Sequence, residues 1–174
     1  MKESELKEAF GSILSHEKFT PHICAIAELI YTDELDRSGL DEILRDFKIV
    51  SIEKIKLEIL DLLLLYISLV LKDFNISEGE QKNMALLKRF FKIKEGDFLE
   101  YRKNEIKAII AQQLEIMYLD GIVDSAEALN KANLQGLFDL SYDQFLQFTD
   151  EGVRQALKRG ADIANLDTVK YPKC

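Results

Sequence analysis

The amino-acid sequence predicts an all-α protein built from a duplicated helix–loop–helix unit. Apolar residues recur at helical spacing along most of the chain, and no segment of comparable length alternates in the manner of a β-strand. Residues 62–101 also resemble residues 109–148 at a constant offset of 47, without a gap. One amphipathic hairpin cannot bury its apolar face alone, so the two copies are expected to pack as a compact helical bundle.

The repeat rests on identical residues at eight equivalent positions. In the first copy these are Asp73, Glu80, Asn83, Ala85, Leu87, Phe91, Phe98 and Leu99, and in the second Asp120, Glu127, Asn130, Ala132, Leu134, Phe138, Phe145 and Leu146. The apolar stretch before each acidic loop matches in kind. The unit is therefore a helix, an acidic loop, a second helix and a turn, used twice.

The predicted helices begin at residues that accept hydrogen bonds from free backbone N–H groups. Thr20 followed by Pro21 suits the start of a helix. Ser51 is expected to open a long apolar helix, whose equivalent in the second copy is expected from Phe98 to Tyr118. Three pairs have the spacing of a capping box: Ser77 with Glu80, Asp124 with Glu127, and Ser141 with Gln144.

The chain length of 174 residues predicts a single all-α domain. We expect the first repeat over residues 51–101 and the second over residues 102–148. Residues 1–50 are expected to form an N-terminal helical extension or a degenerate repeat. Residues 149–174 are expected to hold a helix that ends at Gly160 and a loose tail.

The hypothesis of a degenerate third repeat rests on one echoed tripeptide. Phe47-Lys48-Ile49 resembles Phe91-Lys92-Ile93 and Phe138-Asp139-Leu140. The acidic segment Asp33-Glu34-Leu35-Asp36 lies upstream, where an acidic loop is expected. This alignment needs a gap, so the extension remains the alternative.

Composition limits the partners. The formal net charge is −8 and the isoelectric point is near 4.9, which argues against nucleic-acid binding because that binding depends on Lys and Arg at phosphates. An acidic balance suits a basic protein partner or a cation. The apolar stretch Leu57–Leu71 is too short to span a membrane and predicts a buried helix.

The amino terminus and the cysteines favour a cytoplasmic protein. MKESELKEAF has no apolar run of the kind found in secretory signals. Cys24 and Cys174 provide neither a metal-binding spacing nor a disulfide framework. A protein partner is expected, and the oligomeric state, including a homodimer, is left open.

The two acidic loops are the candidate site for chemistry. Residues 73–80 and 120–127 share the spacing D-x-x-x-[S/D]-x-x-E, and such oxygen-rich loops suit a divalent cation such as Ca²⁺ or Mg²⁺. An EF-hand fits badly, because Met84 and Lys131 occupy the twelfth loop position where a Glu belongs. The candidate metal ligands are Asp73, Glu80, Asp120, Asp124 and Glu127.

Helix capping is the alternative explanation for the same acids. Asp73 and Asp120 would support the turns, and the capping-box pairs would begin the next helices. Capping accounts for every oxygen without a metal. A metal pocket would require the two loops to converge in space.

The second loop and its surroundings resemble the tellurite-resistance TerB-like family. The resemblance rests on residues 120–127, which follow an apolar helix and precede a short helix ending in Leu137-Phe138-Asp139-Leu140-Ser141. It extends over about residues 55–150 and implies paired helical hairpins, a cytoplasmic location, a link to stress or tellurite resistance, and cation binding at the five acids. The first loop departs from the family pattern, with Phe74 in place of the glycine and Ser77 in place of an acid.

Three classes of function remain. The first hypothesis is a TerB-like, non-enzymatic binding protein. The second is a small helical metal-dependent hydrolase that uses carboxylates from both loops, and the third is a protein-interaction scaffold whose acidic loops are purely structural. No catalytic residue is predicted, since His22 and Cys24 fall on different faces of one helix.

Overall fold

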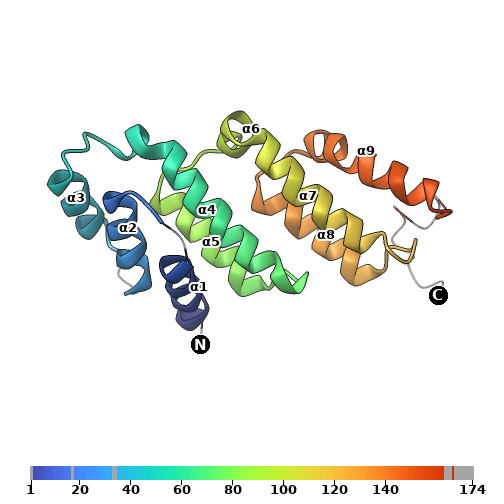
Figure 1. Cartoon of the computed structure of the whole chain (residues 1–174), viewed down its shortest axis with the longest axis horizontal. Coiled ribbons are helices and arrows are strands. Elements are labelled where there is room, and N and C mark those ends of the chain that lie inside the picture. The colour runs from blue at the N-terminus through green and yellow to red at the C-terminus, as the bar shows by residue number, and fades with distance from the viewer. Residues whose placement is uncertain (1, 17, 33–34, 163–165, 167–174) are drawn as a thin grey trace. The chain divides into compact units, whose positions relative to one another are not determined.

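The computed structural model describes residues 2–16, 18–32, 35–162 and 166. Throughout these ranges the chain forms helices and the turns that connect them, without a strand (Figure 1), and the predicted all-α class is confirmed. The described residues form two compact units. The first runs to Lys72 and includes Ser77–Lys94, and the second takes Asp73–Ile76 and the chain from Glu95 onward. The boundary crosses the first predicted repeat, whose role as a domain element stays a prediction.

The first unit contains the N-terminal helices and the apolar helix of the first repeat. Phe10 stacks on Tyr66 at a ring distance of 5.8 Å, which packs α1 against α4. α4 buries eight of its side chains, as the Leu57–Leu71 stretch predicted. The elements are α1 (Lys2–His16), α2 (Pro21–Tyr31), α3 (Arg37–Asp46), the 3₁₀ turn η1 (Ile52–Ile55), α4 (Lys56–Val70) and α5 (Glu78–Phe90).

The second unit has an equivalent core around the second apolar helix. Ile106, Ile110 and Leu114 on one stripe of α7 are fully buried, and the rings of Phe98 and Phe138 meet edge to face at 5.9 Å. The elements are α6 (Asp97–Tyr101), α7 (Lys103–Met117), α8 (Ser125–Leu137) and α9 (Tyr142–Lys158), with the short turn η2 (Leu71–Asp73) at the boundary of the units. Within the described residues, no helix combines the length and the apolar content that crossing a membrane requires.

The helix boundaries reproduce the predicted offset. The first residues of α4 and α7 are 47 positions apart, and so are those of α5 and α8. The members of each pair also have equal lengths, 15 residues for the first helices and 13 for the second. The two copies therefore share one local structure as well as one sequence pattern.

Two predicted continuous helices are broken, at equivalent positions. The helix expected from Ser51 begins as the 3₁₀ turn η1, and the helix expected from Phe98 stops at Tyr101. The breaks lie at Ile55, with φ −113° and ψ 17°, and at Arg102, with φ −135° and ψ 33°. Leaving the helical region lets the turn before each break bury its own apolar side chains, Ile52 and Ile55 in one copy and Phe98 in the other.

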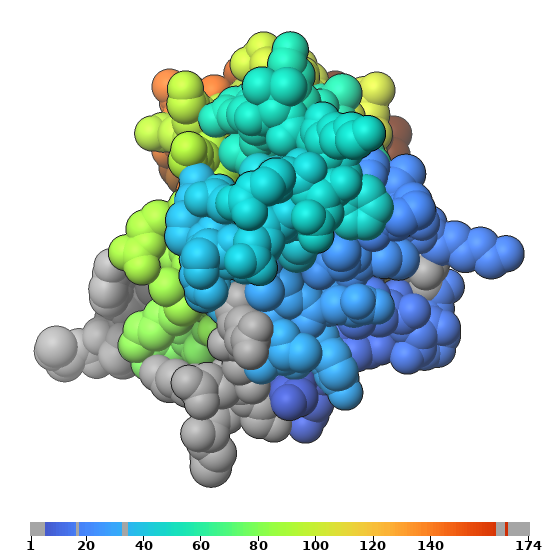
Figure 2. All heavy atoms as spheres, turned by 90° about the vertical axis from the view of Figure 1, so that its left-hand side faces the viewer, coloured from blue at the N-terminus to red at the C-terminus, as the bar shows by residue number. Residues whose placement is uncertain are grey.

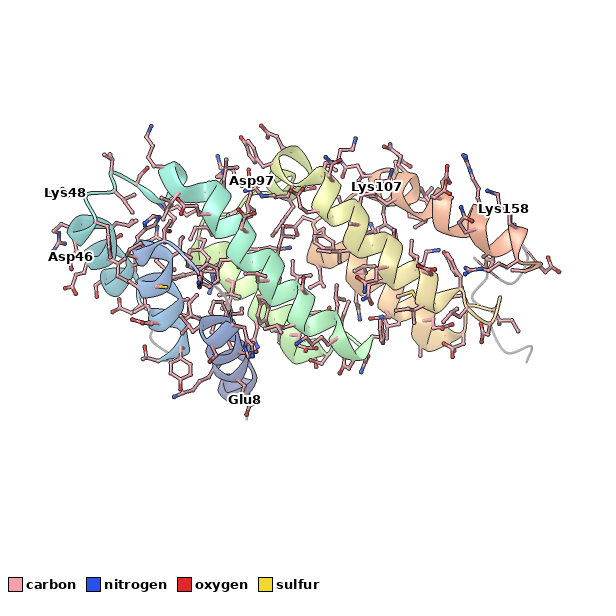
Figure 3. The ribbon with its side chains drawn as sticks, viewed as in Figure 1. Glu8, Asp46, Lys48, Asp97, Lys107 and Lys158 are labelled. Atoms are coloured by element: carbon pink, nitrogen blue, oxygen red, sulfur yellow. The ribbon has the colours of Figure 1, made fainter. Side chains whose placement is uncertain are left out.

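The C-terminal helix also differs from the expectation. α9 begins at its Ser141 cap and continues without interruption to Lys158 (Figure 3), so residues 153–158 extend this helix instead of forming another one. Of the predicted loose tail Asn165–Cys174, all residues except Leu166 lie outside the described part of the chain, and Leu166 is buried.

The same turn ends α3, α5 and α8. The residue after each helix C-cap has a left-handed backbone: φ is 55° at Lys48, 56° at Lys92 and 52° at Asp139 (Lys48 in Figure 3). The next amide closes a Schellman motif, from Ile49 N to Leu44 O at 2.8 Å and at the corresponding atoms of the two repeats. The echoed tripeptides thus adopt one conformation at all three positions.

The start of α3 lies in the acidic segment that the sequence singled out. Asp36 is its N-cap and accepts a hydrogen bond from Ser38 N. The hydrogen bonds from Ser38 lower the pKa of the Asp36 carboxyl. Asp33 and Glu34 lie outside the described residues.

The identical residues Asn83 and Asn130 have different surroundings. In the second unit, Asn130 Oδ1 accepts from the buried Ile76 N at 3.1 Å, and its Nδ2 donates to Phe74 O at 2.7 Å. These bonds fasten residues 73–76 to α8. In the first unit, Asn83 Nδ2 is buried without a hydrogen-bond partner among the described residues.

This difference predicts unequal effects of the same substitution. Asn130→Ala leaves the Ile76 amide unsatisfied in a buried position, and we expect it to lower the free energy of unfolding by about 1–3 kcal/mol. Asn83→Ala removes an amide whose Nδ2 is already unsatisfied, and we expect less than about 1 kcal/mol. Urea titrations of the two variants and the unmodified chain measure both values. Equal losses would contradict the assignment of the two bonds to Asn130.

Candidate functional site

The first acidic loop uses its predicted ligands to hold its own backbone. Asp73 Oδ1 accepts from Asn75 N at 3.1 Å. Ser77 Oγ accepts from Glu80 N at 3.1 Å, and Glu80 Oε2 accepts from Ser77 N at 2.8 Å. The predicted capping box at the start of α5 is therefore confirmed.

The second loop repeats this geometry. Asp120 Oδ1 accepts from Ile122 N at 3.0 Å, Asp124 Oδ1 from Glu127 N at 2.8 Å, and Glu127 Oε2 from Asp124 N at 3.0 Å. Gly121 has φ 76°, equivalent to Phe74 with φ 59° in the first loop. The left-handed position thus persists where the glycine is replaced, although it costs a non-glycine residue about 1–2 kcal/mol.

The five predicted acids pair within their own loops. Each accepts a bond from a backbone amide, which supports the capping explanation. Glu80 belongs to the first unit and the other four acids to the second. Among the described residues, no three His, Cys, Asp or Glu side chains lie together in a way that could hold a metal ion. Cation binding at these acids stays a prediction.

A cavity of about 300 Å³ adjoins the second loop. It is lined by residues 118–122 together with Ala156 and residues 159–162. Asp120 is the one predicted acid in this lining, and Arg159 and Asp162 add one charge of each sign. The hydrolase hypothesis requires several of the predicted carboxylates in one enclosed pocket, and this cavity provides one.

Sequence analysis did not find the polar cluster between α2 and α4. Thr20 Oγ1 donates to Glu58 Oε2 at 2.8 Å, and His22 Nε2 lies 3.0 Å from the same oxygen. Thr20 Oγ1 is also 3.2 Å from His22 Nε2. Thr20 and Glu58 are 38 residues apart, so no local sequence pattern predicts this contact.

The cluster does not have the geometry of a hydroxyl nucleophile with a histidine base. In such a relay the carboxylate orients one ring nitrogen and the hydroxyl faces the other. Here the hydroxyl and the carboxylate both meet Nε2. The three side chains instead join the first turn of α2 to α4, a structural role.

Three more cavities lie between helices of a single unit. One of about 330 Å³ opens between α1 and α4 and includes His16 and Lys72. Another, of about 250 Å³ between α8 and α9, is lined in part by the buried Leu166. The third, about 240 Å³ between α3 and α5, is lined by Leu35, Arg37, Leu86, Arg89 and Phe90. Apolar residues with a few cationic side chains thus line the grooves between helices.

Comparisons of the chain with protein-family models, curated proteins and solved structures find no match. The functional argument therefore depends on the geometry described above.

The capping geometry predicts how the second loop responds to substitution. Asp124→Ala removes the N-cap of α8, and we expect a loss of about 0.5–2 kcal/mol in the free energy of unfolding. Asp120→Asn/Asp124→Asn keeps an oxygen at both positions and should lose much less, since Asn is an equally good cap. Calorimetry with Ca²⁺ and Mg²⁺ on metal-stripped protein completes the test. Saturable binding that the double Asn variant abolishes would contradict a purely structural role.

Proposed function

We propose that this chain is a non-enzymatic helical-repeat protein that works as a protein-interaction scaffold, with its acidic loops serving as helix caps. The observation that carries this proposal is the use of all five candidate acids in bonds to the backbone of their own loops. Carboxylates that already hydrogen-bond the backbone of their own loop are poor candidates for a catalytic centre. Binding is then expected on the exposed surfaces of the helices.

The surface supports binding to a protein. Large apolar side chains are exposed at separate places in both units, with Val50 at 89%, Leu119 at 68% and Tyr142 at 66% of their surface. Leu119 and Tyr142 also line cavities of the second unit. Helices that stack as repeats commonly bind partners through such surfaces.

The proposal includes a TerB-like role for the scaffold. It would act in the cytoplasm and be linked to stress or tellurite resistance. It is supported by the paired hairpins and by the acidic loops that start α5 and α8. Cation binding by the acidic loops is the competing proposal. The Ca²⁺ and Mg²⁺ calorimetry described above decides between the two. The hydrolase is not proposed, because no described cavity gathers the predicted carboxylates.

The test is an unbiased selection of ligands by the full chain. A random peptide display library is selected against the immobilised protein, and against the same protein unfolded as a control. A scaffold is expected to enrich related peptides that then bind saturably in solution. Enrichment equal to that of the unfolded control would overturn the proposal. Light scattering of the free chain, in parallel, gives its oligomeric state.

A further inference from the structure

The groove between the start of α3 and the end of α5 combines an apolar floor with two guanidinium groups. We call its five lining residues the α3–α5 groove: Leu35, Arg37, Leu86, Arg89 and Phe90. All of them belong to the first unit. Figure 2 shows this side of that unit, with α3 in blue to cyan beside the light-green end of α5.

The apolar floor is preformed. Leu86 exposes 41% of its surface, and Leu35 and Phe90 are half-buried. The Phe90 ring packs edge to face on the buried Phe91 at 5.0 Å, which fixes its orientation. An incoming apolar side chain therefore meets a surface that needs little reorganisation, and preorganisation of this kind favours binding.

Both charged residues in the lining of the groove are arginines, opposite in sign to the net charge of the whole chain. Arg37 Nη1 donates to Phe90 O at the end of α5, so this guanidinium is held at the groove with further N–H groups available. Arg89 makes no ion pair with a carboxylate among the described residues. A guanidinium binds a carboxylate through two parallel hydrogen bonds, which gives strength and direction.

The second unit has a polar contact at the corresponding place. Leu35 precedes the N-cap of α3 as Ile76 precedes that of α5. In the second unit, Asn133 Nδ2 donates to Ile76 O at 3.3 Å. Leu86 stands at the position equivalent to Asn133, and Arg89 at that of Gly136. The α3–α5 groove therefore has different side chains from the second repeat at these two positions.

We propose that the α3–α5 groove binds a peptide segment of a partner protein in which a large apolar residue has Asp or Glu beside it. The apolar side chain occupies the cavity, and the carboxylate binds between Arg37 and Arg89. A volume of about 240 Å³ is below the range of about 300–1,000 Å³ typical of small-molecule pockets. It suits one anchoring side chain, as at the centre of a protein interface. This inference rests on the proposed scaffold function.

The test uses a display library with one fixed central Phe and randomised flanking positions, selected on the full chain. Asp and Glu are expected to be enriched in the flanks. The best peptide is then labelled and its Kd measured by fluorescence anisotropy. Leu86→Asn, which imports the residue of the second repeat, and Arg89→Gln should each weaken binding about tenfold or more. Replacing the acids of the peptide by Asn or Gln should weaken it by a similar factor.

Matched controls come from exposed positions outside the groove. Leu129→Asn and Arg154→Gln make the same changes on α8 and α9 of the second unit, and both should leave the Kd unchanged. Thermal unfolding followed by circular dichroism shows that each variant is folded.

The outcomes separate this inference from the function on which it rests. Selected peptides that bind equally to Leu86→Asn and Arg89→Gln would overturn the groove and leave the scaffold intact. Flanks without acidic enrichment would overturn the charge recognition. A change of oligomeric mass in Leu86→Asn, seen by light scattering, would make the groove a contact between copies of this chain and also overturn the inference. Failure of this library alone would overturn the inference, and failure of the fully random library as well would overturn the scaffold itself.

Discussion

The capping boxes at the acidic loops are the constraint on which each repeat depends. A helix begins with backbone N–H groups that lack partners, and Ser77 with Glu80, or Asp124 with Glu127, satisfies two of them at once. The first residue of the second helix is thereby fixed. Since side chains advance by 100° per residue, fixing the start also fixes which side of α5 or α8 is buried, and buried Leu87 and Leu134 then fall at equivalent positions.

Local signals predicted the starts of α5, α8 and α9, whereas the starts of α4 and α7 depend on packing over longer distances. Each capping box lies within four residues, so the sequence contained all of it, and the three boxes are confirmed. The breaks at Ile55 and Arg102 have no cap or glycine to mark them, since they depend on which side chains the core accepts. The Thr20 and Glu58 contact and the α3–α5 groove join residues far apart in the chain, which periodicity does not report.

Divergence between the copies is more informative about function than their identity. Asn83 and Asn130 are the same residue type, but among the described contacts Asn130 alone fastens a loop, so an identical residue has different roles in the two copies. Leu86 and Asn133 differ: Leu86 lines the α3–α5 groove, whereas Asn133 donates to Ile76 O, just before the start of α5. At the α3–α5 groove the polar contact comes instead from Arg37, which donates to Phe90 O.

The overall charge sharpens what such an opening can recognise. At −8, the chain repels an acidic polymer at distances within the Debye length, about 8 Å at physiological ionic strength. Carboxylates alone therefore gain little from approaching it, and the local attraction of Arg37 and Arg89 must be combined with apolar burial to give net binding. Basic segments are attracted by the chain as a whole but meet two guanidiniums in the groove. The negative net charge thus disfavours purely acidic segments, and the two arginines disfavour basic ones. The groove favours a segment that combines an acid with an apolar anchor.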